Sequence, residues 1–222
     1  MIKIQNVSHA YHKKKVLDDV SLHIGANERC ALVGRNGAGK STMIHVMLGL
    51  LPIQKGSIVL GGIPNKKQEW KRIVSYLPEK FHLYPHLTGE ENMRFFASLS
   101  TKKIDEESIA EKLKMVSLYE ARGEQITKYS KGMLQRLGLA VMLYYDSDII
   151  ILDEPTSGLD PMGREEILQI INSLDNKTIL MASHHLSEIE KVCTHVAFLE
   201  DGKVIKYPVD EFIRTHLKEE SK

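Results

Sequence analysis

The order of apolar and polar positions changes along the chain, and its first part has the pattern of short strands. Residues Ile2 to Val7, Val16 to Ile24 and Ser57 to Leu60 alternate or run apolar over strand-like lengths, and Gly61-Gly62 predicts a hairpin turn. We therefore expect the N-terminal part to form a β-rich layer.

The middle of the chain has helical spacing. From about Glu79 to Tyr145 apolar residues recur with a helical period, Thr88-Gly89-Glu90-Glu91 has the spacing of a capping box, and Ile104 to Leu118 is amphipathic. One more helical face is made by Met133, Leu137, Ala140 and Tyr144. This region is interpreted as a helical insert.

The last part alternates short apolar runs with helical stretches. The runs are Asp148 to Leu152, Thr178 to Ala182 and His195 to Leu199, and Arg164 to Leu174 is an example of the helical stretches. Short apolar strands that alternate with helices are typical of a parallel sheet in an α/β protein.

These parts predict a single α/β domain over residues 1–222, without repeats, low-complexity tracts or an interdomain linker. Residues 1–78 and 146–222 are expected to form the β layer and the core, and residues 79–145 the helical subdomain. A short, charged helical tail is expected after Val209.

Composition limits the classes of partner. Of the 222 residues, 42% are hydrophobic, which suits a substantial core. Lys plus Arg (30) nearly equals Asp plus Glu (29), so net charge gives no reason to expect nucleic acid or an anionic membrane surface. No stretch approaches the roughly 20 apolar residues of a membrane span, and the N-terminus lacks the apolar core of a secretory signal. The expected location is cytoplasmic.

Cys30 in an apolar strand and Cys193 on a helix are expected to be buried thiols rather than a redox pair or a metal site.

A glycine-rich loop lies between an apolar strand and a helix, and its spacing predicts binding of a nucleoside triphosphate rather than a plain turn. Its backbone N–H groups wrap a phosphate chain, Lys40 reaches the outer oxygens and Ser41 can ligate Mg²⁺. Side chains at the glycines would hold the backbone away from the phosphates, and the helix N-terminus favours an anion. The loop and its continuation are Gly34, Arg35, Asn36, Gly37, Ala38, Gly39, Lys40, Ser41 and Thr42.

The run Asp148 to Leu152 leads into two adjacent acids, Asp153 and Glu154. Because the run is apolar and buried, both acids emerge at the carboxyl end of a parallel strand, the edge at which the phosphate loop also lies. Asp153 can hold Mg²⁺ there, usually through water. Strand alternation turns Glu154 the other way, where it can orient and deprotonate an attacking water.

From Tyr11 to about Gly202 these motifs, in this order, resemble the ATP-binding subunits of ABC transporters. The resemblance implies a P-loop NTPase (RecA-like) core with an N-terminal antiparallel β layer and an inserted α-helical subdomain. It also implies an ATP sandwich dimer, in which each nucleotide lies between the phosphate loop of one subunit and a signature segment of the other. By this similarity Tyr11 stacks on adenine, His184 contacts the γ-phosphate, Tyr129-Ser130-Lys131-Gly132-Met133 is the signature, and Ser157-Gly158-Leu159-Asp160 crosses the dimer interface.

The signature departs from the family's common Leu-Ser-Gly-Gly-Gln at Tyr129, Lys131 and Met133. The variant resembles that of a bacterial subgroup of drug and peptide exporters, and Lys131 would add positive charge near the γ-phosphate. Ser130 and Gly132 begin a helix, so a hydroxyl, N–H groups and a positive dipole end face outward toward an anion supplied by a second chain.

Glu79 is the second departure, because the family usually has Gln after Pro78. A carboxylate can still meet Mg²⁺ directly or through water. The segment Phe81 to Leu87 that follows is aromatic for a loop. It either helps to form a groove for a cytoplasmic helix of a membrane partner or packs the helical insert.

The histidine next to His184 is given no role in the site. His185 is expected to point away from it, and His185 and Glu188, one helical turn apart, are expected on a solvated helix face.

The hypothesis is a Mg²⁺-dependent ATPase subunit that works as a homodimer or heterodimer and energises a separately encoded membrane permease at the inner face of the cell membrane. Export of a drug, peptide or other small molecule is favoured by the subgroup resemblance. The alternatives are an importer subunit, or a soluble ABC-type ATPase in translation or DNA repair. Such soluble relatives generally have two cassettes or a long coiled-coil insertion, which this sequence does not show. No nucleic-acid partner is expected.

Overall fold

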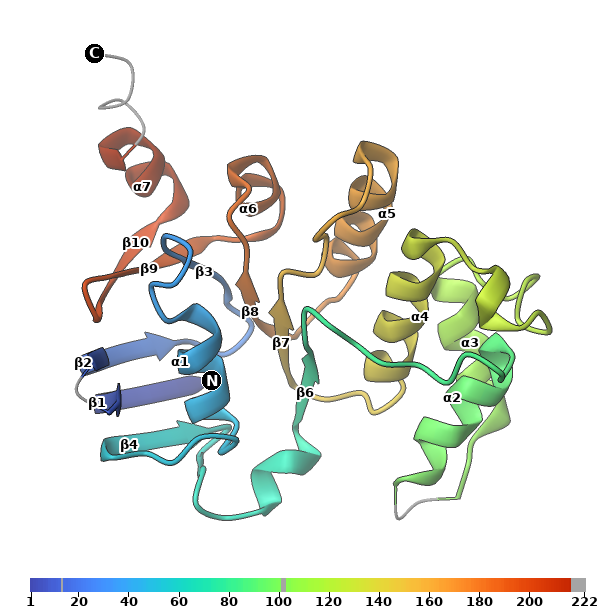
Figure 1. Cartoon of the computed structure of the whole chain (residues 1–222), viewed down its shortest axis with the longest axis horizontal. Helices are drawn as coiled ribbons and strands as arrows, with labels where there is room; N and C mark the ends of the chain where they lie inside the picture. Colours follow the sequence, from blue (N-terminus) through green and yellow to red (C-terminus); the bar gives the residue numbers. More distant parts are fainter. Residues whose placement is uncertain (13, 101–102, 217–222) are drawn as a thin grey trace.

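The computed structural model describes residues 1–12, 14–100 and 103–216, which form two sheets and the helices that cover them (Figure 1). The first sheet is antiparallel, in the order β2-β1-β4-β5. It contains β1 (Ile2–Tyr11), β2 (Lys14–Ile24), β4 (Lys55–Leu60) and β5 (Ile63–Pro64). The hairpin predicted at Gly61-Gly62 is confirmed, since Leu60 pairs with Ile63 across it.

The second sheet has the order β10-β9-β3-β8-β7-β6 and is parallel except for its edge strand β10. This confirms the parallel sheet predicted from the apolar runs, while β6 and β10 were not foreseen as strands. The strands are β3 (Arg29–Val33), β6 (Val74–Leu77), β7 (Ile149–Asp153), β8 (Thr178–Ala182), β9 (His195–Glu200) and β10 (Lys203–Pro208). The carboxyl ends of β3, β6, β7 and β8 therefore share one edge.

Helices of the predicted insert begin later than the sequence pattern suggested. Residues 79–88 contain no helix, because Pro85 disfavours one and the buried Asn92 bonds both the N–H and the carbonyl of Tyr84. The expected capping box is confirmed at Thr88, which exchanges hydrogen bonds with Glu91. The insert contains α2 (Gly89–Ser98), α3 (Glu106–Met115), a 3₁₀ turn (Ile126–Lys128) and α4 (Lys131–Leu143).

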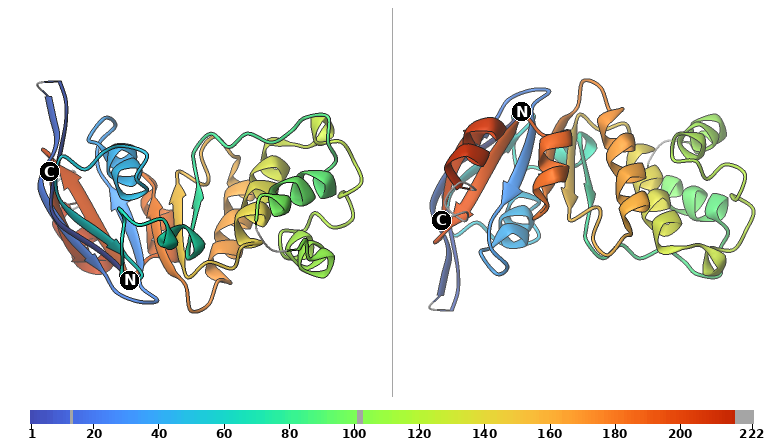
Figure 2. Two further views of the ribbon diagram at one scale, coloured as in Figure 1. Left: turned by 90° about the horizontal axis from the view of Figure 1, so that it is seen from below. Right: turned by 90° about the horizontal axis from the view of Figure 1, so that it is seen from above.

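The remaining helices pack around the second sheet, apart from a 3₁₀ turn at Glu69–Arg72. They are α1 (Lys40–Met47), α5 (Pro161–Asn172), α6 (Leu186–Val192) and α7 (Val209–His216). The helical tail expected after Val209 is present up to His216, and residues 217–222 lie outside the described residues. Figures 1 and 2 show α2 and α3 at the end of the molecule opposite to the four-stranded sheet. Within the described residues, no helix combines the length and the apolar character needed to cross a membrane.

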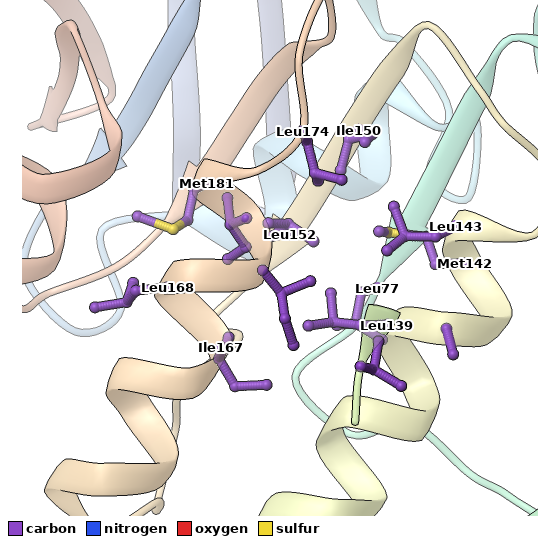
Figure 3. Close-up of a cluster of buried hydrophobic side chains, with 14 of the residues drawn as sticks. Leu77, Leu139, Met142, Leu143, Ile150, Leu152, Ile167, Leu168, Leu174 and Met181 are labelled. Carbon is purple, nitrogen blue, oxygen red and sulfur yellow. The ribbon is translucent and has the colours of Figure 1, made fainter. Parts of the chain in front are cut away.

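Both faces of β7 are buried, which explains its continuous apolar sequence. Ile149 and Ile151 pack toward α1 and the four-stranded sheet, and Ile150 and Leu152 pack toward α4 and α5. Figure 3 shows the second of these cores, where side chains of α4 and α5 meet those of β6, β7 and β8. This packing holds the ends of the strands rigidly.

Both cysteines are buried and free, as expected. Burial raises the pKa of the Cys30 thiol to about 12 and raises that of Cys193 as well. Cys193 lies just past α6 in extended backbone rather than on a helix, because α6 ends at Val192.

Candidate functional site

The loop from β3 to α1 packs closely against its surroundings at two of its three glycines, Gly34 and Gly39. A β-carbon at Gly34 would lie 2.4 Å from the carbonyl oxygen of Leu199, and one at Gly39 would lie 2.5 Å from Val16 Cγ1. Gly39 also has a φ of 109°, a backbone conformation that residues with a side chain rarely adopt. Lys40 is 8% exposed, and its ammonium donates to the Gly34 carbonyl at 2.9 Å. The loop is therefore shaped around the start of α1.

This loop and the two adjacent acids at the end of β7 line a pocket of about 500 Å³. The pocket brings together most of the residues predicted to bind nucleotide or metal. Gly34, Arg35 and Ala38 belong to the same loop but do not line the pocket. The lining residues are Tyr11, Lys14, Val16, Asn36, Gly37, Gly39, Lys40, Ser41, Thr42, Glu79, Asp153 and Glu154.

Asp153 is the last residue of β7 and is 5% exposed. Burial raises the pKa of its carboxyl, and the nearby charge of Glu79 acts in the same direction. The Ser41 hydroxyl, His45 and Lys40 oppose this shift. A buried carboxylate, a hydroxyl and a second carboxylate at one pocket wall are oxygen donors that fit Mg²⁺.

Glu154 lies one residue past the end of β7, with φ of 50°. The expectation that strand alternation turns it away from Asp153 is wrong, because the left-handed backbone ends the alternation and both acids line one pocket. Its N–H donates to the carbonyl of Ala182 at the end of β8, and its Oε2 lies 2.8 Å from His184 Nδ1.

His184 and His185 follow β8. Their ring centroids are 4.0 Å apart, so the expectation that His185 points away from His184 is wrong. The reason is the same as at Glu154: β8 ends at Ala182, and strand alternation does not continue past it. Half of the His184 side chain is exposed, whereas Glu154 keeps only 13% of its side chain accessible.

Tyr11 ends β1 at the mouth of the pocket and is 46% exposed. The rings of the buried His9 and of Tyr11 form a T-shaped pair with a centroid distance of 5.0 Å, and His9 is itself bonded to the carbonyl of Pro52. Lys14 and Val16 of β2 also line the pocket and were missed in the sequence. The signal available in the sequence for Lys14 was its basic side chain directly after the turn that follows Tyr11.

A second pocket, of about 370 Å³, holds the predicted signature and interface residues and shares no lining residue with the first. Ser130 caps α4 by accepting from the Met133 N–H, and Asp160 caps α5 by accepting from the Gly163 N–H. The pocket is lined by Ser130, Lys131, Gly132, Arg136, Gly158, Leu159, Asp160, Met162, Gly163 and Glu166. Within one chain, the two predicted halves of the site are separate.

Two of the three residues at which the predicted signature departs from the common pattern, Tyr129 and Lys131, have defined contacts. Tyr129 is 7% exposed, and its hydroxyl donates to the carbonyl of Ala121. A β-carbon at Gly89 would lie 2.4 Å from that hydroxyl, so Tyr129 and Gly89 fit as a pair. The ammonium of Lys131 lies directly over Gly158, where a β-carbon would come within 2.0 Å of it.

The aromatic segment after Glu79 is partly packed into the helical part and partly exposed. Phe81 packs into the helical part, with its ring 5.5 Å from that of Phe96. Tyr84 contacts the ring of Phe95 at 4.3 Å and leaves 45% of its surface exposed.

Glu188 is 2% exposed, which corrects the expectation that it lies on a solvated helix face. It accepts hydrogen bonds from the hydroxyls of Thr156 and Ser183. Helical spacing alone could not reveal this, because both partners lie outside its helix.

Comparison with known proteins gives a consistent match. The family model described as "ABC transporter" matches residues 17–157. The lantibiotic transport ATP-binding protein SrtF of Streptococcus pyogenes is 36% identical over 92% of this chain and 89% of its own length. The linearmycin resistance ATP-binding protein LnrL of Bacillus subtilis is 33% identical over 92% of this chain and 68% of its own length. The ATP-binding cassette MJ0796, solved as a dimer in a post-hydrolysis state bound to ADP and Pi, has a TM-score of 0.82 at 26% identity and covers 94% of this chain and 99% of its own.

Proposed function

Because this chain belongs to the ABC transporter family and is an ATP-binding, ATP-hydrolysing transporter subunit, we propose that it hydrolyses ATP in a sandwich of two cassettes. The observation that carries this proposal is the separation of the phosphate-loop pocket from the signature pocket within one chain. A second cassette would bring its signature pocket against the nucleotide held by the first.

In the first half of this site, the phosphate loop (Gly34 to Thr42) and Lys40 bind the phosphates, and Tyr11 stacks on the adenine. Mg²⁺ would be held by Ser41 and Asp153, with Glu79 close enough to act directly or through water, and it would offset the negative charge of the phosphates. Support comes from the shared pocket and from the buried carboxyl of Asp153, whose pKa is raised mainly by burial and also by the nearby charge of Glu79.

Hydrolysis requires a base for the attacking water, and Glu154 takes this role. Its contact with His184 Nδ1 fixes the direction of both side chains. When both ring nitrogens of His184 carry a proton, Nδ1 donates to Glu154 and Nε2–H remains available for a γ-phosphate oxygen. The contact therefore links the base, Glu154, to His184, which contacts the γ-phosphate.

The second half of the site comes from the other cassette. Ser130 and Gly132, at the N-terminus of α4, offer a hydroxyl, N–H groups and the positive end of a helix dipole to the γ-phosphate, and Lys131 adds a charge. Asp160 caps α5 in the same pocket and would lie at the dimer interface. Loss of the γ-phosphate removes the anion that holds the two cassettes together, so the dimer opens.

The opening and closing would drive a separate membrane permease, at the inner face of the cell membrane. In the proposed division of the chain, residues 79–145 form the subdomain that carries both the signature and the half-exposed Tyr84, and residues 1–78 and 146–222 form the β layer and core. We propose that Tyr84 helps to form the groove for a permease helix. Relatives named for lantibiotic transport and linearmycin resistance favour export of a small molecule or peptide.

The test is affinity capture of tagged Glu154→Gln protein from detergent-solubilised membranes of the native host, with ATP and Mg²⁺. Co-purification of a protein with several membrane spans supports the transporter assignment and identifies the permease. The double variant Glu154→Gln/Ser130→Arg is the control, since it should bind ATP without closing the sandwich. Capture of ribosomes or DNA-processing proteins without a membrane protein would contradict the proposal and favour the soluble-cassette alternative.

A further inference from the structure

A buried carboxylate on α6 connects two catalytic loops that are far apart in the sequence. Glu188 accepts from the Thr156 hydroxyl, whose oxygen lies 2.8 and 2.9 Å from the two carboxylate oxygens, and from the Ser183 hydroxyl at 2.8 Å. Both partners are at most 1% exposed. The three side chains thus form a closed cluster beneath the site surface.

Each partner of Glu188 is adjacent to a functional residue. Thr156 lies two residues after Glu154, in the loop that continues to Asp160 at the start of α5. Ser183 directly precedes His184, and its hydroxyl also accepts from the His185 N–H at 3.1 Å. Glu188 therefore ties the loop after β7 to the loop after β8, which the Glu154–His184 contact also joins.

The chemistry of this cluster fixes the direction of its hydrogen bonds. Among the described residues no cation forms an ion pair with Glu188, and its side chain is bonded by the hydroxyls of Thr156 and Ser183. A carboxylate only accepts hydrogen bonds, which obliges both hydroxyls to point toward it. Removing either hydroxyl leaves a buried carboxyl oxygen with one hydrogen-bond donor fewer, and an unsatisfied buried polar group costs free energy, so the two hydroxyls hold the loops together.

We propose that Glu188 is a positioning residue for ATP hydrolysis: it clamps the loop that carries Glu154 and Asp160 to the loop that carries His184. This inference rests on the proposed function. The clamp makes a shift of Asp160 at the proposed dimer interface move Glu154 and His184 together, and Glu188 itself lines neither pocket.

The test uses Thr156→Val and Ser183→Ala in the full chain, because both changes remove one hydroxyl and almost no volume. We expect kcat for ATP to fall about 10- to 100-fold, since small displacements of catalytic groups have effects of this size. KM and the ATP affinity measured by calorimetry should stay within about twofold. Glu188→Gln combined with Thr156→Val should lose less than the product of the two single losses, because both act on one clamp.

Thr178→Val is the matched control. Thr178 is 3% exposed and its hydroxyl accepts from the Asn27 N–H, but it lies at the other end of β8. The control should lower the melting temperature as much as Thr156→Val and leave kcat unchanged. Equal kcat in Thr156→Val and Thr178→Val would overturn the clamp, as would a kcat loss fully explained by the unfolded fraction.

Failure of the clamp and failure of the proposed function give different results. If Glu154→Gln is inactive while Thr156→Val and Ser183→Ala retain normal kcat, only the clamp falls. If Glu154→Gln itself retains normal kcat, the assignment of the base falls, and the clamp falls with it.

Discussion

The phosphate-loop pocket and the signature pocket differ in how much of their chemistry is already fixed within one chain. In the first, Lys40 and Asp153 are buried and Glu154 is held by His184 and by its backbone bond to Ala182. In the second, Ser130 and Asp160 are exposed and bond only within their own helices. The proposed sandwich accounts for this difference, because in it one half is preorganised for ATP and the other offers a surface to a second cassette.

The largest expected effect tests the chemical side of this comparison. Glu154→Gln should lower ATP turnover about 1000-fold, within the range contributed by general bases, while ATP affinity stays normal. The glutamine keeps the shape of the side chain and still accepts from His184. Turnover is measured as phosphate release, and the persistent ATP-bound dimer by size-exclusion chromatography with light scattering. The control is Glu165→Gln, an exposed acid on α5. Unchanged turnover in Glu154→Gln would remove it as the base.

Lys40→Ala tests whether the first pocket binds ATP without the second. Loss of a buried ammonium that donates to phosphate oxygens should weaken ATP binding roughly 10- to 100-fold. Calorimetry on the monomer, at protein concentrations too low for dimers, measures this directly. Lys15→Ala removes an exposed charge from nearby β2 and should have no effect. Normal affinity in Lys40→Ala would mean that the phosphate loop is misassigned.

Ser130→Arg tests the opposite half and should leave monomer binding of ATP intact. Arginine bulk at the start of α4 should block the sandwich, so ATP-dependent dimers fall more than about tenfold. Thr88→Arg is the matched control, because Thr88 caps α2 as Ser130 caps α4. Both changes lose a helix cap at a cost of about 1 kcal/mol, and only one faces the signature pocket. An ATP-induced dimer of Ser130→Arg would contradict the signature assignment.

Sequence reasoning was most accurate where local rules act alone. The apolar run Thr178 to Ala182 is strand β8 as predicted, and the capping box at Thr88 forms as its spacing requires. The P-loop core was also foreseen, because its glycines and its apolar strand belong to one continuous segment.

Sequence reasoning failed where residues of different loops meet or where a strand ends. Alternation wrongly separated Glu154 from Asp153 and His185 from His184, since the backbone leaves the strand at these positions. Glu188 was assigned to solvent because its partners come from two other loops. These contacts depend on the arrangement of parallel strands, which no local pattern contains.

Burial at Asp153 makes a smaller, pH-dependent prediction about the first pocket. Its carboxyl has a raised pKa, so the folded state holds this proton more tightly than the unfolded state does. The folded protein therefore loses stability as pH rises from the ordinary carboxyl value through the raised one. Asp153→Asn lacks this loss, and its melting temperature without ligand should exceed that of the wild type by more at pH 7 than at pH 4.

In the presence of ATP, Mg²⁺ should make the melting temperature of the wild type higher than that of Asp153→Asn, because only Asp153 gains a counter-charge. Asp148→Asn is the control, since Asp148 is exposed at the other end of β7 and carries no burial cost. Scanning calorimetry at both pH values measures the difference. Equal melting temperatures for Asp153→Asn and wild type at pH 7 would contradict this account of the buried charge.

The smallest effect concerns the surface that neither pocket uses. Tyr84→Ala should leave ATP turnover of the isolated protein within about twofold, because Tyr84 lines neither pocket. It should weaken association with the permease, since a half-exposed tyrosine offers a large contact area. Leu99→Ala removes a more exposed apolar residue just after α2 and is the control. Membrane association and substrate-stimulated hydrolysis are measured in reconstituted vesicles. If Tyr84→Ala matches Leu99→Ala in both, the aromatic segment only packs the helical part, and contact with the permease lies elsewhere.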